Sequence, residues 1–432
     1  MGEKCSVLNR LFEFPHIFKS IKAGFRKNPF FYAFVFLLLL SSFAIFSFEN
    51  MALDNVRVDK FASYFYNGIF ILMIIGCFIK AIADLAKKHR FPPIAFKTFV
   101  VLLASLFVFA ASSLINRNFV KTPYINTLLF FIIFAVVASA KREEKWVVLY
   151  SIFISLSLYV FVAFCFYFKD IFNFKNVSGR IGEEFGNQDR FVVPFSMLYV
   201  VSALFLEKNK FFVLIPVFLS IPLVLLSQTR VVLIVLVISM LIYFKRLCDR
   251  YSKTHLFIII VAITAVIAVI LIFLPTNISM FERFRNMFIA ILTGSGDDSF
   301  MERIMLIRRS LIFGFTHLFS GYGFDGILSY SSQASHDVFG DVAFSYGGLF
   351  ALIYVLFFVS LFIEAFTRKN GKGMASYLLG YFLIYFISGV FLSSRIVSIF
   401  FGVCFAFCVD SGKTMPVKHK REVPGAYCEI RI

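Results

Sequence analysis

The chain has 432 residues, of which 60% are hydrophobic and only 16% are charged. This composition excludes an ordinary soluble domain and indicates a protein that lies mainly in a lipid bilayer. The formal net charge is +18, but its distribution along the chain indicates membrane orientation rather than a nucleic-acid partner.

Apolar segments of about the length of a transmembrane helix follow one another along the chain. They cover residues 29–48, 62–82, 98–116, 123–140, 146–168, 191–206, 211–226, 230–244, 256–274, 343–366, 374–392 and 395–410. The sixth to eighth are short and closely spaced, so their boundaries are the least defined. We therefore expect an all-α integral membrane protein with about twelve transmembrane helices.

The basic residues lie mostly on one side of this predicted arrangement. With the N-terminus inside, 28 of the 43 Lys and Arg residues fall inside and 15 outside, whereas the acidic residues divide 11 to 14. Positive charge on the cytoplasmic side predicts that both chain ends are cytoplasmic.

The predicted chain divides into five parts. Residues 1–28 form a cytoplasmic segment, residues 29–274 hold helices one to nine, and residues 275–342 form a long external loop. Residues 343–410 hold the last three helices, and residues 411–432 form a cytoplasmic tail.

The external loop is too long to serve only as a connection. Within it, apolar residues recur at helical spacing from Phe300 to Phe315 among arginines, which predicts an amphipathic helix at the membrane surface. Gly321-Tyr322-Gly323 ends this pattern, and Ser335-His336-Asp337 precedes the tenth predicted helix. Loops of this kind commonly carry the functional residues of a protein.

Arginines and one histidine gather on the predicted outer side, whereas almost no ionisable residue lies in the middle of a predicted helix. The set comprises Arg180, Arg190, Arg230, Arg283, Arg285, Arg303, Arg308, Arg309, Arg395 and His336. Guanidinium groups bind phosphate through paired, charge-assisted hydrogen bonds. A histidine accepts a proton from a sugar hydroxyl near neutral pH. Together they favour group transfer from a phosphate-activated donor.

Several of these residues, and His317, also have a structural interpretation; for His336 it is that of an ordinary loop histidine. Arg230 is equally well placed to anchor its helix at the interface, and Arg395 to orient the last helix. Arg303 fits a solvated helix face, Arg308 and Arg309 fit surface charges, and His317 fits a structural role.

Three stretches together resemble the O-antigen ligase and polysaccharide polymerase superfamily of bacterial envelopes. They are the turn Leu226–Arg230, the stretch from Glu302-Arg303 to Gly321-Tyr322-Gly323, and His336-Asp337 followed by Gly347-Gly348. The likeness spans roughly residues 180–400. Two positions depart from the family pattern: Asp337 stands where Asn, Ser or Gln is usual, and Phe350 stands where the last glycine would fall.

The resemblance implies a GT-C-like polytopic bundle that transfers a glycan from undecaprenyl diphosphate outside the cytoplasmic membrane. The acceptor is a growing polysaccharide repeat in a polymerase or a lipid A core sugar in a ligase. By this analogy Arg230 and Arg303 hold the diphosphate, Arg180, Arg190 and Arg395 assist, and His336 activates the acceptor hydroxyl. No metal or other cofactor is implied. The alternatives are a transporter or flippase for lipid-linked sugars or small solutes, and a non-catalytic scaffold or sensor.

Overall fold

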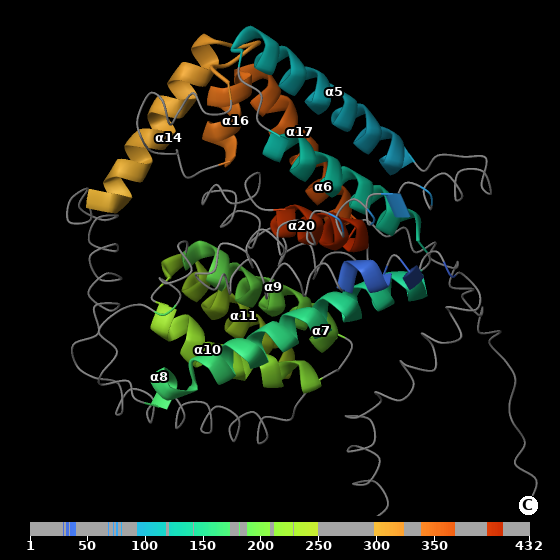
Figure 1. Cartoon of the computed structure of the whole chain (residues 1–432), viewed down its shortest axis with the longest axis vertical. Helices are drawn as coiled ribbons and strands as arrows, with labels where there is room; N and C mark the ends of the chain where they lie inside the picture. Colours follow the sequence, from blue (N-terminus) through green and yellow to red (C-terminus); the bar gives the residue numbers. More distant parts are fainter. Residues whose placement is uncertain are drawn as a thin grey trace, which may run out of the picture.

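The computed structural model describes residues 29, 32–33, 35–39, 68, 72, 75–76, 79, 93–117, 121–140, 142–172, 181, 188–207, 211–227, 229–248, 298–323, 338–367 and 395–408. All regular elements among these residues are helical (Figure 1). The predicted segments 256–274 and 374–392 lie outside the described residues, and 29–48 and 62–82 are represented only by scattered positions.

The described helices follow the order of the predicted apolar segments. They are α5 (Pro93–Ile115), α6 (Lys121–Ser139), α7 (Arg142–Phe166), α8 (Phe168–Phe172), α9 (Gln188–Glu207), the 3-10 helix η3 (Phe211–Val213), α10 (Leu214–Ser227), α11 (Arg230–Cys248), α14 (Asp298–Thr316), α16 (Val338–Tyr346), α17 (Gly348–Thr367) and α20 (Arg395–Cys408).

One predicted helix is divided in the structure. The apolar run 343–366 was expected to form a single helix, but α16 ends at Tyr346 and α17 begins at Gly348. Gly347 between them has a φ of 95°, a conformation that side-chain-bearing residues rarely adopt. The break is therefore a property of the backbone that hydrophobic periodicity does not register.

Two described helices are long and apolar enough to cross a bilayer, namely Lys145–Phe166 within α7 and Gly348–Phe366 within α17. Shorter apolar helices occupy Val100–Ile115, Leu128–Ala138, Phe191–Ala203, Leu214–Ser227 and Val397–Phe407. Large apolar side chains on α5 are exposed, among them Phe107 and Leu114. Lipid is the environment that suits such exposed apolar surface.

Helices α6 and α20 pack against each other over most of their length. Gly402 of α20 makes this close approach possible, because a Cβ there would lie 2.9 Å from the carbonyl oxygen of Phe130. Small residues at such contacts let two helix backbones approach closely in a membrane, where dispersion forces hold helices together. Phe405 of α20 packs at an edge-on angle against Phe130, with ring centroids 6.3 Å apart.

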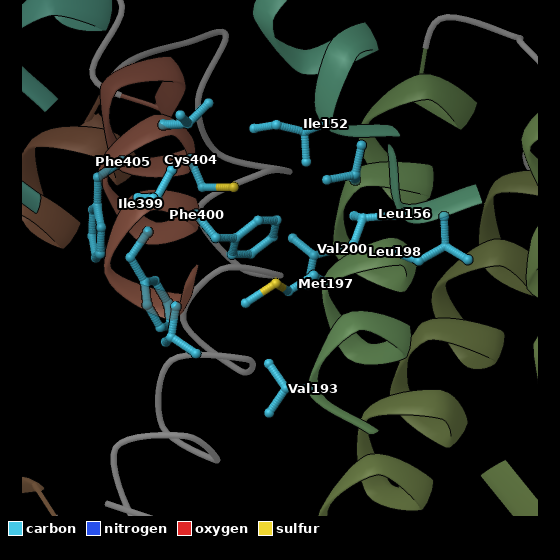
Figure 2. Close-up of a cluster of buried hydrophobic side chains, with 14 of the residues drawn as sticks. Ile152, Leu156, Val193, Met197, Leu198, Val200, Ile399, Phe400, Cys404 and Phe405 are labelled. Carbon is cyan, nitrogen blue, oxygen red and sulfur yellow. The ribbon is translucent and has the colours of Figure 1, made fainter. Parts of the chain in front are cut away.

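Helix α20 also contributes to a buried apolar cluster with α7 and α9. Figure 2 shows Phe400 of α20 pointing toward Met197 and Val200 of α9. All three side chains are buried. At the far ends of these helices, Trp146 of α7 contacts both Phe205 of α9 and Phe407 of α20, at 5.7 and 4.9 Å between ring centroids. The contacts run in the same order along both helices, so α9 and α20 are parallel.

Buried hydroxyl groups tie α7, α9, α10 and α11 together. The Tyr243 hydroxyl of α11 donates to the carbonyl of Tyr199 in α9 at 2.6 Å, and the Tyr199 hydroxyl pairs with Ser220 of α10 at 2.8 Å. The Tyr159 hydroxyl of α7 donates to the carbonyl of Phe191 at 3.0 Å. Polar groups inside an apolar bundle require such partners because neither lipid nor apolar side chains supply them.

Candidate functional site

Two predicted site arginines lie at or near the start of a helix at one end of the α7–α9–α10–α11 group. The backbone N–H of Ile181, the residue after Arg180, donates to the carbonyl of Leu226 at 3.4 Å. This bond joins the segment before α9 to the last turn of α10, close to Arg230 at the start of α11. Arg190 lies in the first turn of α9. These chain positions are therefore gathered, although they are far apart in the sequence.

The start of α20 faces the same end. Because α20 runs parallel to α9, its first residue, Arg395, lies toward the beginning of α9 rather than toward its end. The end of α7 also reaches this side, where Tyr167, the residue after α7, contacts Phe191 with ring centroids 5.5 Å apart. Three helices that start with or near an arginine thus begin on one side of the bundle.

Arg303 belongs to a different unit, formed by α14, α16 and the beginning of α17. Helices α14 and α16 are parallel, since Gly314 lies against Ala343 and, further along, Leu318 lies against Gly347. Val338, at the start of α16, precedes Ala343 by five residues. At a rise of about 1.5 Å per residue, it lies about 7 Å before the level of Gly314 along α14, toward the half that carries Arg303. His336 precedes Val338 by two residues in the sequence.

The chain reverses at a junction that we call the elbow, comprising residues 317–323 and 344–349. The backbone N–H groups of Tyr322 and Gly323 donate to the carbonyls of Phe344 and Ser345 at 2.8 and 3.0 Å. The N–H of Leu349 donates to the carbonyl of Leu318 at 3.1 Å. These bonds fasten the end of α14 to the end of α16 and to the first turn of α17.

Glycines make the elbow possible. Gly321, Gly323 and Gly347 have φ values of 58°, 87° and 95°. A Cβ at Gly347 would also overlap the backbone of Leu318, and one at Gly314 would overlap the backbone of Ala343. At Gly321 and Gly347, two of the glycines that carry the family resemblance, both the backbone conformation and the close packing therefore exclude a larger residue.

Helix α5 supports the elbow from a distant part of the sequence. The Ser112 hydroxyl donates to the carbonyl of Ser345 at 2.9 Å. The Asn116 side-chain amide donates to the carbonyl of Ser112 at 2.9 Å, and the Asn116 side chain covers Gly323. Ser112 and Asn116 carry no recognisable motif, so sequence reasoning missed both residues.

An aromatic group covers the outside of the elbow. Tyr322 stacks on Phe344 with ring centroids 4.9 Å apart and lies 4.2 Å from the ring of His317. Nδ1 of His317 is 3.1 Å from the Thr316 hydroxyl. The side chain of His317 is exposed, and its contacts agree with the structural interpretation given to it above.

The predicted site residues are described to different degrees. His336 and Arg180 lie outside the described residues. Arg190, Arg230, Arg303 and Arg395 have described helical backbones, but their side chains lie outside the described part. Within the described residues, no group of three or more His, Cys, Asp or Glu side chains is arranged to hold a metal ion.

The elbow leads to a prediction about stability. Gly347→Ala is expected to destabilise the protein by more than the roughly 1–2 kcal/mol that a left-handed backbone conformation costs an L-residue, because the added methyl group also meets the Leu318 backbone. Thermal unfolding of the purified protein in detergent measures the effect. Gly76→Ala is the matched control, since no described residue lies within 4 Å of a Cβ at that position. Equal unfolding temperatures for the two variants would refute the packing argument.

No family model matches the chain, and neither a curated protein nor a solved structure matches it significantly.

Proposed function

We propose that the chain is a multi-pass glycosyltransferase of the cytoplasmic membrane, of the O-antigen ligase or polysaccharide polymerase type. It has about twelve transmembrane helices and transfers a glycan from undecaprenyl diphosphate to an acceptor sugar on the extracytoplasmic face. The acceptor is a growing polysaccharide repeat or a lipid A core. The type of enzyme is inferred from the sequence resemblance at Leu226–Arg230, Glu302–Gly323 and His336–Gly348.

The observation that carries the proposal is the parallel packing of α14 and α16 through the glycine elbow. The resemblance rests partly on glycines at 321, 323, 347 and 348, and these residues meet at one junction. The junction orients the helix that carries Arg303 alongside the helix that His336 precedes in the sequence. An arrangement of this kind supports a common site for residues that a transferase needs close together.

The proposed chemistry uses only side chains of this protein. The acceptor hydroxyl oxygen attacks the anomeric carbon of the donor glycan, and the bond from that carbon to the phosphate oxygen breaks. His336 takes the proton of the attacking hydroxyl. Arg303 and Arg230, with Arg180, Arg190 and Arg395 as further cations, bind the departing diphosphate and stabilise the charge that develops on it.

A lipid-linked donor also explains why cationic helix starts would gather at one end of an apolar bundle. The polyprenyl chain of the donor remains in the bilayer, and its diphosphate lies at the membrane–water boundary. Helices that begin near this boundary bring their first residues to the level of the diphosphate. Arg190, Arg230 and Arg395 lie in the first turns of α9, α11 and α20, which supports this assignment.

A deletion strain of the host organism tests the proposal. Loss of the gene is expected to remove the long-chain envelope polysaccharide and to leave glycan attached to the lipid carrier on the extracytoplasmic face. Stranded single repeats would identify a polymerase, and stranded full-length polymer a ligase. Re-expression of the wild-type chain is expected to restore the profile.

The same strain separates the transferase from a flippase. A membrane-impermeant oxidant applied to intact spheroplasts modifies carrier-linked glycan only if the glycan has already crossed the membrane. Protection from the oxidant would support the flippase and contradict the proposal. An unchanged polysaccharide profile would contradict both.

A further inference from the structure

The face of α14 that points away from α16 is rich in large apolar side chains. Leu306, Ser310 and Gly314 are buried on the opposite side, where α14 packs on α16. The outward face carries the exposed large apolar side chains of Ile304, Met305, Ile312 and Phe315. Two more, Leu318 and Phe319, follow in the elbow. A helix at the surface of a soluble protein shows the reverse pattern, with its apolar side turned toward the core.

The elbow fixes the level of this helix relative to the bilayer. The N–H of Leu349, in the first turn of the apolar span of α17, donates to the carbonyl of Leu318 just after α14. The apolar part of α5 ends at Ile115 beside the same junction, next to Asn116. Because two apolar helices end here, the C-terminal end of α14 lies at the boundary between lipid and water. From the elbow α14 and α5 diverge (Figure 1).

Two arginines lie among the exposed apolar residues. Arg308 and Arg309 are both exposed, and each is flanked along the helix by apolar side chains such as Met305 and Ile312. An amphipathic helix in the interface buries its apolar side chains below the headgroups and keeps its arginines at the level of the phosphates. A second copy of the chain would present the same cations to this face and repel them, whereas an anionic lipid surface attracts them.

We propose that the outward face of α14 is seated in the interfacial layer of the bilayer, where Arg308 and Arg309 bind the phosphates of anionic phospholipids. This surface does not include Arg303, which precedes Arg308 by five residues in α14. The inference does not depend on glycosyl transfer and stands if the proposed activity fails.

Tryptophan fluorescence of the full chain in vesicles tests this seating. Trp146 is the single tryptophan, so Trp146→Phe gives a silent background that keeps an aromatic ring at that position. Ile312→Trp in this background places a reporter on the outward face of α14. We expect lipids brominated near the headgroup end of their chains to quench it, and water-soluble acrylamide to quench it weakly.

Lipid charge and the arginines provide the second arm. Vesicles of equal parts phosphatidylcholine and phosphatidylglycerol are expected to give stronger quenching by brominated lipid than phosphatidylcholine alone. Replacing Arg308 and Arg309 with glutamine is expected to remove that difference, with seating weakened by about fivefold for each arginine. High salt is expected to have the same effect because it screens the attraction.

A matched control reports on lipid contact that does not depend on charge. Phe107→Trp in α5 replaces a side chain that is 74% exposed on an apolar helix, and its quenching is expected to ignore both lipid charge and the arginine substitutions. Strong acrylamide quenching at position 312 would overturn the seating. If protection from both quenchers grows with the number of chains per vesicle, a second copy of the chain rather than lipid covers the outward face, and the proposal is overturned. Lipid quenching that ignores phosphatidylglycerol would overturn the phosphate contacts.

Discussion

Replacing His336 with alanine is expected to lower the rate of glycan transfer by about 10²–10⁴-fold, which is the usual contribution of a positioned general base. The amount of protein in the membrane is expected to stay at the wild-type level. In the proposed reaction His336 takes the proton of the acceptor hydroxyl, and the surrounding arginines have no basic lone pair with which to replace it at neutral pH. Transfer to the acceptor, measured as polysaccharide restored in the deletion strain per unit of protein, checks the prediction.

Two further substitutions separate a catalytic role for His336 from a structural one. His336→Gln keeps a polar side chain of similar size but cannot carry the proton, so it is expected to be as inactive as the alanine variant. His317→Ala is the matched control: its side chain is exposed, and in the described structure it contacts the Tyr322 ring and the Thr316 hydroxyl. Full transfer by His336→Ala would exclude the histidine from the chemistry.

The helical elements were predictable because a transmembrane segment is encoded locally, by its length and its apolar content. Segments 98–116, 123–140 and 146–168 correspond closely to α5, α6 and α7. The break at Gly347 was not predicted. Whether a glycine in an apolar run bends the chain depends on what packs against it. Here the backbone of Leu318 packs against Gly347.

The candidate site was predictable only where a motif marks it. Gly321 and Gly323 were predicted to end the helix; α14 ends earlier, at Thr316, and both glycines have a positive φ in the turn that follows it. The support from Ser112 was not recognised, because the hydroxyl bonds to Ser345, 233 residues away in the sequence. A serine in an apolar helix has no feature that distinguishes this bond from a local one, such as that of Ser105 to the carbonyl of Val101.

The amphipathic pattern of α14 shows a different limit. Helical spacing from Phe300 to Phe315 predicted a helix, and α14 occupies Asp298–Thr316. The same spacing cannot say which side of the helix meets the protein. The side with Ser310 and Gly314 packs on α16 because small residues allow close approach, which leaves the bulky apolar side facing outward. Packing against a helix more than 20 residues further along the chain therefore determines the orientation.

Replacing Arg303 with alanine is expected to lower glycan transfer by about 10²–10³-fold, the usual cost of removing one group that stabilises charge in a transition state. The physical reason is that the diphosphate leaves carrying negative charge that water at the membrane boundary neutralises less well than a fixed guanidinium group. Arg303→Lys keeps the charge but loses the paired hydrogen bonds, so its rate is expected to fall between those of wild type and Arg303→Ala. Lys97→Ala is the matched control, because it removes an exposed cation in the first turns of α5, remote from the elbow.

The rate of product formation at saturating donor shows whether Arg303 acts on the leaving group. If the guanidinium stabilises charge that appears only as the bond breaks, the maximal rate falls and the apparent affinity for the lipid-linked donor changes little. A fall in affinity with an unchanged maximal rate would assign Arg303 to ground-state binding of the diphosphate. Wild-type kinetics for Arg303→Ala would leave the residue as a solvated side chain of α14, and the diphosphate would then have to be held by the helix starts that carry Arg190, Arg230 and Arg395.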